Sequence, residues 1–191
     1  MKAVFGLGNP GAAYALTRHN VGFEVIDLYR KTHRLRRAGR IESECLIYRA
    51  DDLLLCKPLT YMNESGLAVA GVLAKHSISL SDTLIVYDEL DLPLGRIKVL
   101  SAGGAGTHKG MKSIQAALRT NEVPRLRIGI EVEGRTEPGE AFVLKRFAKD
   151  EWRRVVPALE RAVDAIDDFR RADIETVMTR FNRRDESGCR T

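Results

Sequence analysis

The sequence lacks several features that would place it in other protein classes. Its three cysteines are widely spaced and include no C-x-x-C pair, which favours reduced thiols over a disulfide framework. No apolar run approaches the ~20 residues of a membrane span. The opening apolar residues give way to Gly-Asn-Pro-Gly too early for a signal-peptide core. We therefore expect a soluble, cytoplasmic protein with no membrane partner.

Motifs for metal binding and for a serine nucleophile are also missing. The four histidines include no H-x-x-x-H pair, and no G-x-S-x-G run is present. Asp88, Glu89 and Asp91 offer carboxylates for a magnesium ion, but acidic residues at the end of a strand often only solvate a loop. The sequence therefore predicts an activity that needs no metal and no cofactor.

Positive charge is in excess. The 191 residues carry 31 Lys and Arg against 26 Asp and Glu, a net charge of +5 with a pI of about 9.2. This balance favours an anionic partner, nucleic acid first, although solubility alone is the open alternative. A hydrophobic content of 44% and this length suit one α/β domain with a substantial core.

Hydrophobic periodicity gives the expected order of elements. Short apolar runs predict strands at 3–7, 41–50, 53–57, 83–87, 96–100 and 125–132. Amphipathic runs predict helices at 21–32, from 63 or 65 to 76, 110–118, 150–171 and 173–181. We expect a single globular α/β domain over 1–183, with a mixed, mostly parallel twisted sheet and helices on both faces. The charged residues 184–191 are expected to form a mobile tail.

Two asparagines have a simple structural interpretation. Asn20 stands where it can cap the helix 21–32, and Asn63, or Ser65 close by, can cap the helix that follows. Residues 101–106 form a glycine-rich loop before a helix, which favours an anion such as a phosphate, with Lys109 adding a charge. The alternative is a plain turn between a strand and a helix. Residues 133–140 are predicted to form a polar loop.

The run Gly6-Leu7-Gly8-Asn9-Pro10-Gly11 fits the dinucleotide-binding pattern G-x-G-x-x-G after a strand. Asp27 lies about where a ribose-binding acid would. However, such an acid belongs at the end of a second strand, whereas Asp27 falls within a predicted helix, and Pro10 occupies a position where the helix should pack. A dinucleotide-binding oxidoreductase is therefore the weaker alternative.

The remaining polar residues indicate a hydrolytic site. His19 lies in a polar loop, is expected to be partly exposed, and is the natural general base near neutrality. Asp88, at the carboxyl end of the most apolar strand, can orient that histidine. Asn9 and Asn63 follow or open elements at the same edge and can hold a carbonyl group. As alternatives, Asn9 only shapes its turn and Asn63 only caps its helix.

Long motifs add a resemblance that covers nearly the whole chain. The matching runs lie at 6–11, 17–23, 57–66, 87–95, 103–114, 126–130, 143–144 with 147, and 178–182. In these runs the chain resembles bacterial peptidyl-tRNA hydrolases. The resemblance implies a monomeric, metal-free α/β enzyme that cleaves the ester joining a peptide to the 3′ end of tRNA. Its partner would be the acceptor stem and 3′ end of peptidyl-tRNA.

The resemblance also implies roles at matching positions. His19 would activate the water with support from Asp88, and Asn9 would help distinguish a blocked amino group from a free one. Asn63 would hold the substrate near the ester. Further binding residues implied in the same way are Tyr14, Tyr61, Met62, His108 and Lys109.

Three departures from the family pattern bear on RNA binding. Where the family reads Gly-Gly-His-Asn-Gly, this chain has Gly106-Thr107-His108-Lys109-Gly110, so that a lysine replaces an asparagine. Leu100 and Ala102 stand where the family often has basic residues, and Glu131-Val132-Glu133-Gly134 replaces a Gly-His-Pro run. Lys98, Lys109 and Arg127 are candidates to compensate. These departures keep open the alternative of a catalytically silent RNA-binding relative.

Overall fold

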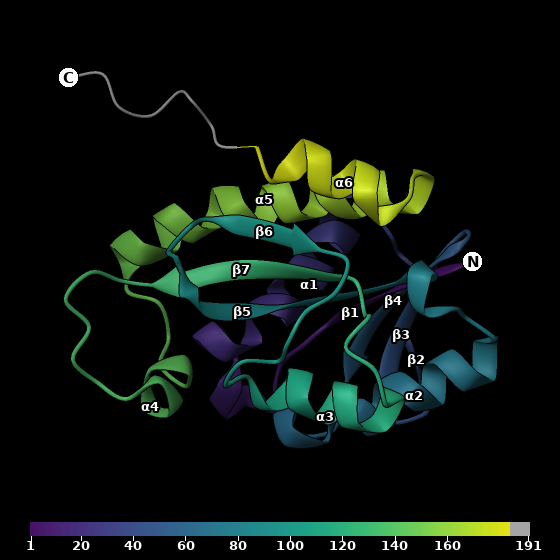
Figure 1. The fold of residues 1–191 in the computed structure, drawn as a ribbon, viewed down its shortest axis with the longest axis horizontal. Helices are drawn as coiled ribbons and strands as arrows, with labels where there is room; N and C mark the ends of the chain where they lie inside the picture. The colour runs from purple at the N-terminus through teal and green to yellow at the C-terminus, as the bar shows by residue number, and fades with distance from the viewer. Residues whose placement is uncertain (184–191) are drawn as a thin grey trace.

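One seven-stranded sheet lies between two layers of helices in the computed structural model (Figure 1). The structure describes residues 1–183, and the tail predicted at 184–191 lies outside the described residues. The strands are β1 (Lys2–Gly6), β2 (Arg40–Glu42), β3 (Cys45–Ala50), β4 (Leu53–Pro58), β5 (Thr83–Pro93), β6 (Ile97–Leu100) and β7 (Arg125–Glu131). The α-helices are α1 (Val21–Thr32), α2 (Ser65–His76), α3 (Lys109–Leu118), α4 (Gly139–Val143), α5 (Lys149–Arg171) and α6 (Ile174–Phe181). Four 3₁₀ turns complete this part of the chain: η1 (Ala12–Tyr14), η2 (Arg18–Asn20), η3 (Met62–Glu64) and η4 (Leu80–Asp82).

The strand order β2-β3-β4-β1-β5-β7-β6 confirms the predicted mixed α/β sheet. Strands β4, β1, β5 and β7 pair in parallel at the centre, and antiparallel pairs form both edges. Because the four central strands run in the same direction, their carboxyl ends meet at one edge of the sheet, where ligands bind in open α/β sheets.

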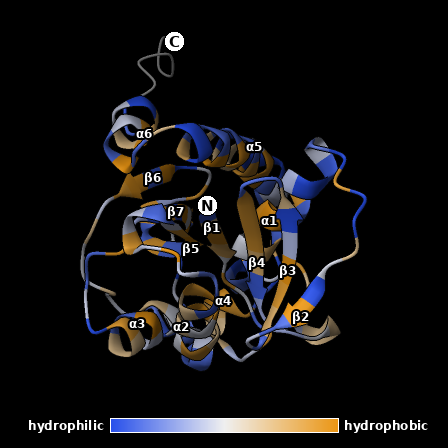
Figure 2. Cartoon of the chain, turned by 90° about the vertical axis from the view of Figure 1, so that its right-hand side faces the viewer, coloured by the Kyte–Doolittle hydropathy of each residue, from blue (hydrophilic) through white to orange (hydrophobic). Residues whose placement is uncertain are grey.

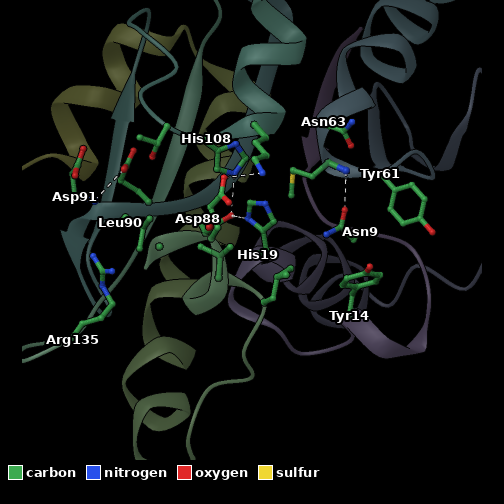
Figure 3. Close-up of a pocket in the computed structure, with 18 residues that line it drawn as sticks. Asn9, Tyr14, His19, Tyr61, Asn63, Asp88, Leu90, Asp91, His108 and Arg135 are labelled. Carbon is green, nitrogen blue, oxygen red and sulfur yellow. Dashed lines mark hydrogen bonds and ion pairs between the residues drawn. The ribbon is translucent and has the colours of Figure 1, made fainter. Parts of the chain in front are cut away.

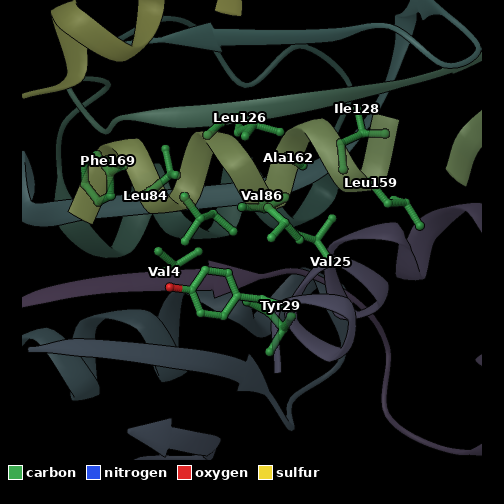
Figure 4. Close-up of a cluster of buried hydrophobic side chains, with 14 of the residues drawn as sticks. Val4, Val25, Tyr29, Leu84, Val86, Leu126, Ile128, Leu159, Ala162 and Phe169 are labelled. Atoms are coloured by element: carbon green, nitrogen blue, oxygen red, sulfur yellow. The ribbon is translucent and has the colours of Figure 1, made fainter. Parts of the chain in front are cut away.

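Alternation along each central strand divides the core between the two faces. Val4 and Val86 pack with α1 and α5 in one cluster (Figure 4), whereas Phe5 and Tyr87 pack with α2 and α3 in the other. Figure 2 shows α5 and α6 on one side of the sheet and α2 and α3 on the other. Each large apolar side chain buried in this way contributes about 1.5–3 kcal/mol.

A close backbone contact fixes the start of α1 against the sheet. A Cβ atom on Gly6 would lie 2.2 Å from the carbonyl oxygen of Gly22, so neither glycine has room for a side chain there. The 3₁₀ turn η2 directly precedes α1 and is therefore carried close to the ends of β1 and β5.

Four sequence predictions are corrected by the structure. The strand predicted at 41–50 is broken by Ser43 and Glu44, whose φ angles are 49° and 54°. Strand β5 does not end at residue 87 but continues to 93, because pairing with β7 holds its polar half. A short helix, α4, begins within the loop predicted at 133–140. Finally, Asn20 occupies the N-cap position of α1 and Asn63 lies in η3 before α2, but no side-chain hydrogen bond caps either helix.

Among residues 1–183, no helix combines the length and the apolar composition needed to cross a bilayer.

Candidate active site

A groove of 570 Å³ opens at the carboxyl edge of the parallel strands (Figure 3). Asn9 follows β1, Met62 follows β4 and Asp88 lies on β5, so the topology brings together residues that are far apart in the sequence. All nine predicted site residues line this groove: Asn9, Tyr14, His19, Tyr61, Met62, Asn63, Asp88, His108 and Lys109. In Figure 3, His19 and Asp88 lie between the two tyrosines on one side and Leu90, Asp91 and Arg135 on the other.

His19 lies in η2, and only 8% of it is exposed, so it is more buried than the sequence suggested. Its Nδ1 is 2.9 Å from Oδ1 of Asp88. Burial disfavours the imidazolium, but the charge and hydrogen bond of Asp88 outweigh burial and raise the pKa of His19, while Lys109 opposes them. With Nδ1 as the donor to Asp88, Nε2 is free to accept a proton.

Asp88 is 2% exposed and accepts a second hydrogen bond, from Nε2 of His108 at 3.1 Å. Burial alone would raise the pKa of Asp88, but the two histidines hold it well below its usual range. The backbone N–H of Met111 donates to Nδ1 of His108 at 3.1 Å, which leaves the ring proton on Nε2. His108 is therefore a donor to Asp88, a role that the sequence did not indicate.

His19, Asp88 and His108 are also residue types that bind metal ions. His19, Asp88 and His108 each offer a ligand atom within 4.8 Å of the others. A histidine that binds a metal through Nε2 carries its proton on Nδ1 and donates it. Nδ1 of His108 instead accepts from Met111. The hydrogen bonds therefore fit a network that holds protons better than they fit a metal centre.

Asn9 is held in one orientation by three hydrogen bonds. Its backbone N–H donates to Oδ1 of Asn20 at 2.8 Å, and its carbonyl oxygen accepts from Nδ2 of Asn20 at 2.9 Å. Its side-chain Oδ1 accepts from the backbone N–H of Met62 at 2.8 Å. The amide nitrogen of Asn9 is thus the group presented to a ligand, as a donor. Asn20, predicted as a helix cap, positions Asn9 instead.

Two tyrosines form one end of the groove. The rings of Tyr14 and Tyr61 meet edge to face, with centroids 6.4 Å apart. Tyr61 is 56% exposed, and Asn63 is also exposed, whereas Met62 is buried beneath them. An exposed aromatic pair beside an amide suits contact with a planar or peptide group.

Charged residues lie toward the other end. Nζ of Lys109 is 2.9 Å from Oε1 of Glu140, which joins the start of α3 to α4. Arg135 pairs with Glu131 at 2.8 Å. The groove residues that sequence reasoning missed come largely from this end: Leu90, Arg135, Glu140, Val143 and Leu144. Leu90, Val143 and Leu144 fall in runs that match the family pattern. Neither a period nor a motif marks Arg135 or Glu140, which come from a loop and one short helix.

The three cations proposed to compensate in RNA binding differ in whether they already form an ion pair. Arg127 pairs with Glu89, and Lys109 pairs with Glu140. Lys98 is exposed and forms no ion pair with residues 1–183. Leu100 and Ala102 supply no charge. Of these three candidates, Lys98 alone has no ion pair among residues 1–183.

The dinucleotide alternative loses its acidic residue. Asp27 lies inside α1 and is 2.7 Å from Nζ of Lys57, so it does not stand at the end of a second strand. The turn after β1 instead presents Asn9.

The chain is similar to known proteins in both sequence and structure. The family model described as peptidyl-tRNA hydrolase matches residues 3–188. The peptidyl-tRNA hydrolase of Listeria monocytogenes is 39% identical over 190 residues, covering 96% of this chain and all of the relative. That of Chloroflexus aurantiacus is 41% identical over 188 residues, covering 95% and 99%. A crystal structure of peptidyl-tRNA hydrolase from Acinetobacter baumannii superposes with a TM-score of 0.85 at 28% identity, covering 95% of this chain and 94% of that one. The chain therefore belongs to the peptidyl-tRNA hydrolase family.

Proposed function

We propose that this protein hydrolyses the ester bond between a peptide, or an N-acyl-amino acid, and the 3′ end of tRNA. The observation that carries the proposal is the buried hydrogen bond of 2.9 Å between His19 and Asp88. Both residues line the same groove as Asn9, whose amide is a donor. Together they provide a general base and a carbonyl-binding donor beside a cavity large enough for a ligand.

In the proposed reaction Nε2 of His19 takes a proton from water as the water oxygen attacks the ester carbonyl carbon. Asp88 stabilises the imidazolium that forms, and His108 fixes the carboxylate from the other side. The bond from the carbonyl carbon to the ribose oxygen then breaks, and His19 returns the proton to that oxygen. The products are a tRNA with a free 3′ end and a peptide carboxylic acid, which loses its remaining proton to the solvent.

Asn9 supplies selectivity in this scheme. Because its Oδ1 is engaged by Met62, its Nδ2 faces the ligand only as a donor. A donor binds the carbonyl oxygen of a blocked amino group, whereas the ammonium of a free aminoacyl ester has no acceptor to offer and leaves the buried amide unpaired. Asn63, Tyr14 and Tyr61 hold the rest of the substrate along the groove.

We further propose that the protein works as a monomer in the cytoplasm and without a metal. One chain supplies every side chain that the scheme uses. The hydrogen bonds of His108 favour proton-carrying roles for the three clustered groups. An ester is already activated toward water, so one base and a few donors suffice.

The test is release of a labelled N-acyl-amino acid from N-acyl-aminoacyl-tRNA, run beside the same tRNA with a free amino group. His19→Ala is the control for the general base. We expect release from the blocked substrate only, and its loss in the variant. Absence of release, with salt-sensitive tRNA binding intact, would refute the enzyme and favour the silent RNA-binding relative.

A further inference from the structure

The segment that joins α1 to β2 has an unusual charge composition. Residues 28–41 contain six Lys and Arg and no Asp or Glu. Protein surfaces ordinarily mix the two signs. We name residues 31–40 the connector; its cations are Lys31, Arg34, Arg36, Arg37 and Arg40.

The connector is anchored, so its cations have a defined place. Leu35 packs against the core and donates its backbone N–H to the carbonyl oxygen of Arg30 at 2.9 Å. Nε2 of His33 is 3.0 Å from Asp167 on α5. With Leu35 turned inward, the arginines around it are exposed. Figure 2 shows this segment as a loop at the border of the molecule, between α1 and β2.

Neither local structure nor ion pairing accounts for these cations. Lys31 lies in the last turn of α1, where its charge complements the helix dipole. Arg36, Arg37 and Arg40 lie beyond the end of the helix, so the dipole does not account for them. No carboxylate of residues 1–183 forms an ion pair with any of the five connector cations. By contrast Lys109 and Arg135, the Lys and Arg side chains that line the groove, are both ion-paired.

The connector also lies within reach of a substrate held at His19. Helix α1 has 12 residues, so its ends are about 18 Å apart. His19 lies two residues before Val21, the first residue of α1, and the connector begins in the last turn of that helix. A nucleic acid whose 3′ end enters the groove therefore needs to extend along only one helix to meet the connector.

We propose that the connector is a second RNA-binding surface, which grips the phosphate backbone of tRNA while the groove holds its 3′ end. The inference deepens the proposed function and rests on it for the identity of the RNA. Exposed arginines without carboxylate partners are suited to phosphates, because the guanidinium donates two hydrogen bonds to one phosphate. Contact of this kind reads no sequence, so it would position the tRNA without selecting among tRNAs.

The experiment measures binding of fluorescently labelled, deacylated tRNA by anisotropy over a range of salt concentrations. The test variant is Arg36→Ala with Arg37→Ala. A matched control is Arg153→Ala with Arg154→Ala, which removes another adjacent, exposed arginine pair, on α5. A second control, Arg36→Lys with Arg37→Lys, keeps the charge. Thermal melting of each variant checks that it folds.

We expect the test variant to bind tRNA roughly 10-fold more weakly at 100 mM salt and to lower the salt slope by about 1 to 2 units. The Arg153–Arg154 control should stay near the wild type. The lysine variant should keep the salt slope, because it keeps the charge, and bind with an affinity between those of the wild type and the test variant. Wild-type affinity in the test variant, or equal weakening in the Arg153–Arg154 control, would overturn the proposal. So would unchanged tRNA binding together with lost binding to phosphatidylglycerol vesicles, which would assign the surface to a membrane.

Because deacylated tRNA has no ester to cleave, this result is independent of hydrolysis. A protein that releases N-acyl-amino acids but shows no connector effect would refute only the second surface. A protein that does not hydrolyse the ester but loses tRNA binding through the connector would refute only the enzyme.

Discussion

Replacing Asp88 by asparagine tests the centre of the proposed mechanism. The substitution keeps the size of the side chain and removes its charge from a position 2.9 Å from Nδ1 of His19. Two charges about 4 Å apart attract by roughly 4 kcal/mol at an effective dielectric constant near 20. If that attraction stabilises the imidazolium in the transition state, its loss slows the reaction by about 10³-fold.

The pH dependence gives a second and more specific readout. Water activation requires neutral His19, so the rate rises as pH increases through its pKa. Asp88 raises that pKa and burial lowers it. In Asp88→Asn burial acts without the carboxylate, so the pKa of His19 falls. The acid limb, the part of the kcat/KM profile that rises with pH, therefore moves to lower pH even though the maximal rate falls.

The assay is initial-rate hydrolysis of N-acyl-aminoacyl-tRNA between pH 5 and 9, with Asp91→Asn as the control. Asp91 is an exposed carboxylate in the same groove, and its loss should leave the acid limb in place. An unchanged rate and an unmoved acid limb in Asp88→Asn would refute the role of Asp88. A limb that moves equally in both variants would point to the general field of the groove instead.

Three further predictions follow from neighbouring contacts. His19→Ala should lower kcat by at least about 10²-fold and cost about 1–3 kcal/mol in urea denaturation, because buried Asp88 loses a donor. Lys109→Met should move the acid limb to higher pH, opposite to the Asp88 change, because the charge of Lys109 lowers the pKa of His19. Arg18→Met should lower the free energy of unfolding by about 3 kcal/mol, because the largely buried Glu151 carboxylate, 2.6 Å from Arg18, would lose its ion-pair partner.

Matched variants separate the causes. Glu140→Gln breaks the ion pair with Lys109 but keeps the lysine charge. If the acid limb moved to higher pH in Glu140→Gln as well as in Lys109→Met, the electrostatic explanation would be contradicted. Arg180→Met removes an exposed arginine paired with Asp168 and should cost less than about 1 kcal/mol. Equal losses in the Arg18 and Arg180 variants would contradict the assigned importance of burial. Full stability in His19→Ala would show that His108 alone satisfies Asp88.

Local patterns were sufficient where one element depends on its own residues. The helix at 21–32 was predicted with its correct ends, because its apolar face repeats with the helical period. The second half of β5 was not predicted, because acidic residues there give no strand signal and only pairing with β7 holds them. Helix α4 was missed for a similar reason, since five residues are too few to show a period.

The sequence by itself determined the chemical inventory: one histidine suited to be a base, one carboxylate after an apolar run, two amides, and motifs long enough to indicate the family. Only the tertiary structure decided how these groups are used. It turned the amide of Asn9 into a donor through Met62, placed His108 on Asp88, and paired Lys109 with Glu140. Hydrogen-bond partners depend on strand order and on the close approach of separate elements, and neither is written in local periodicity.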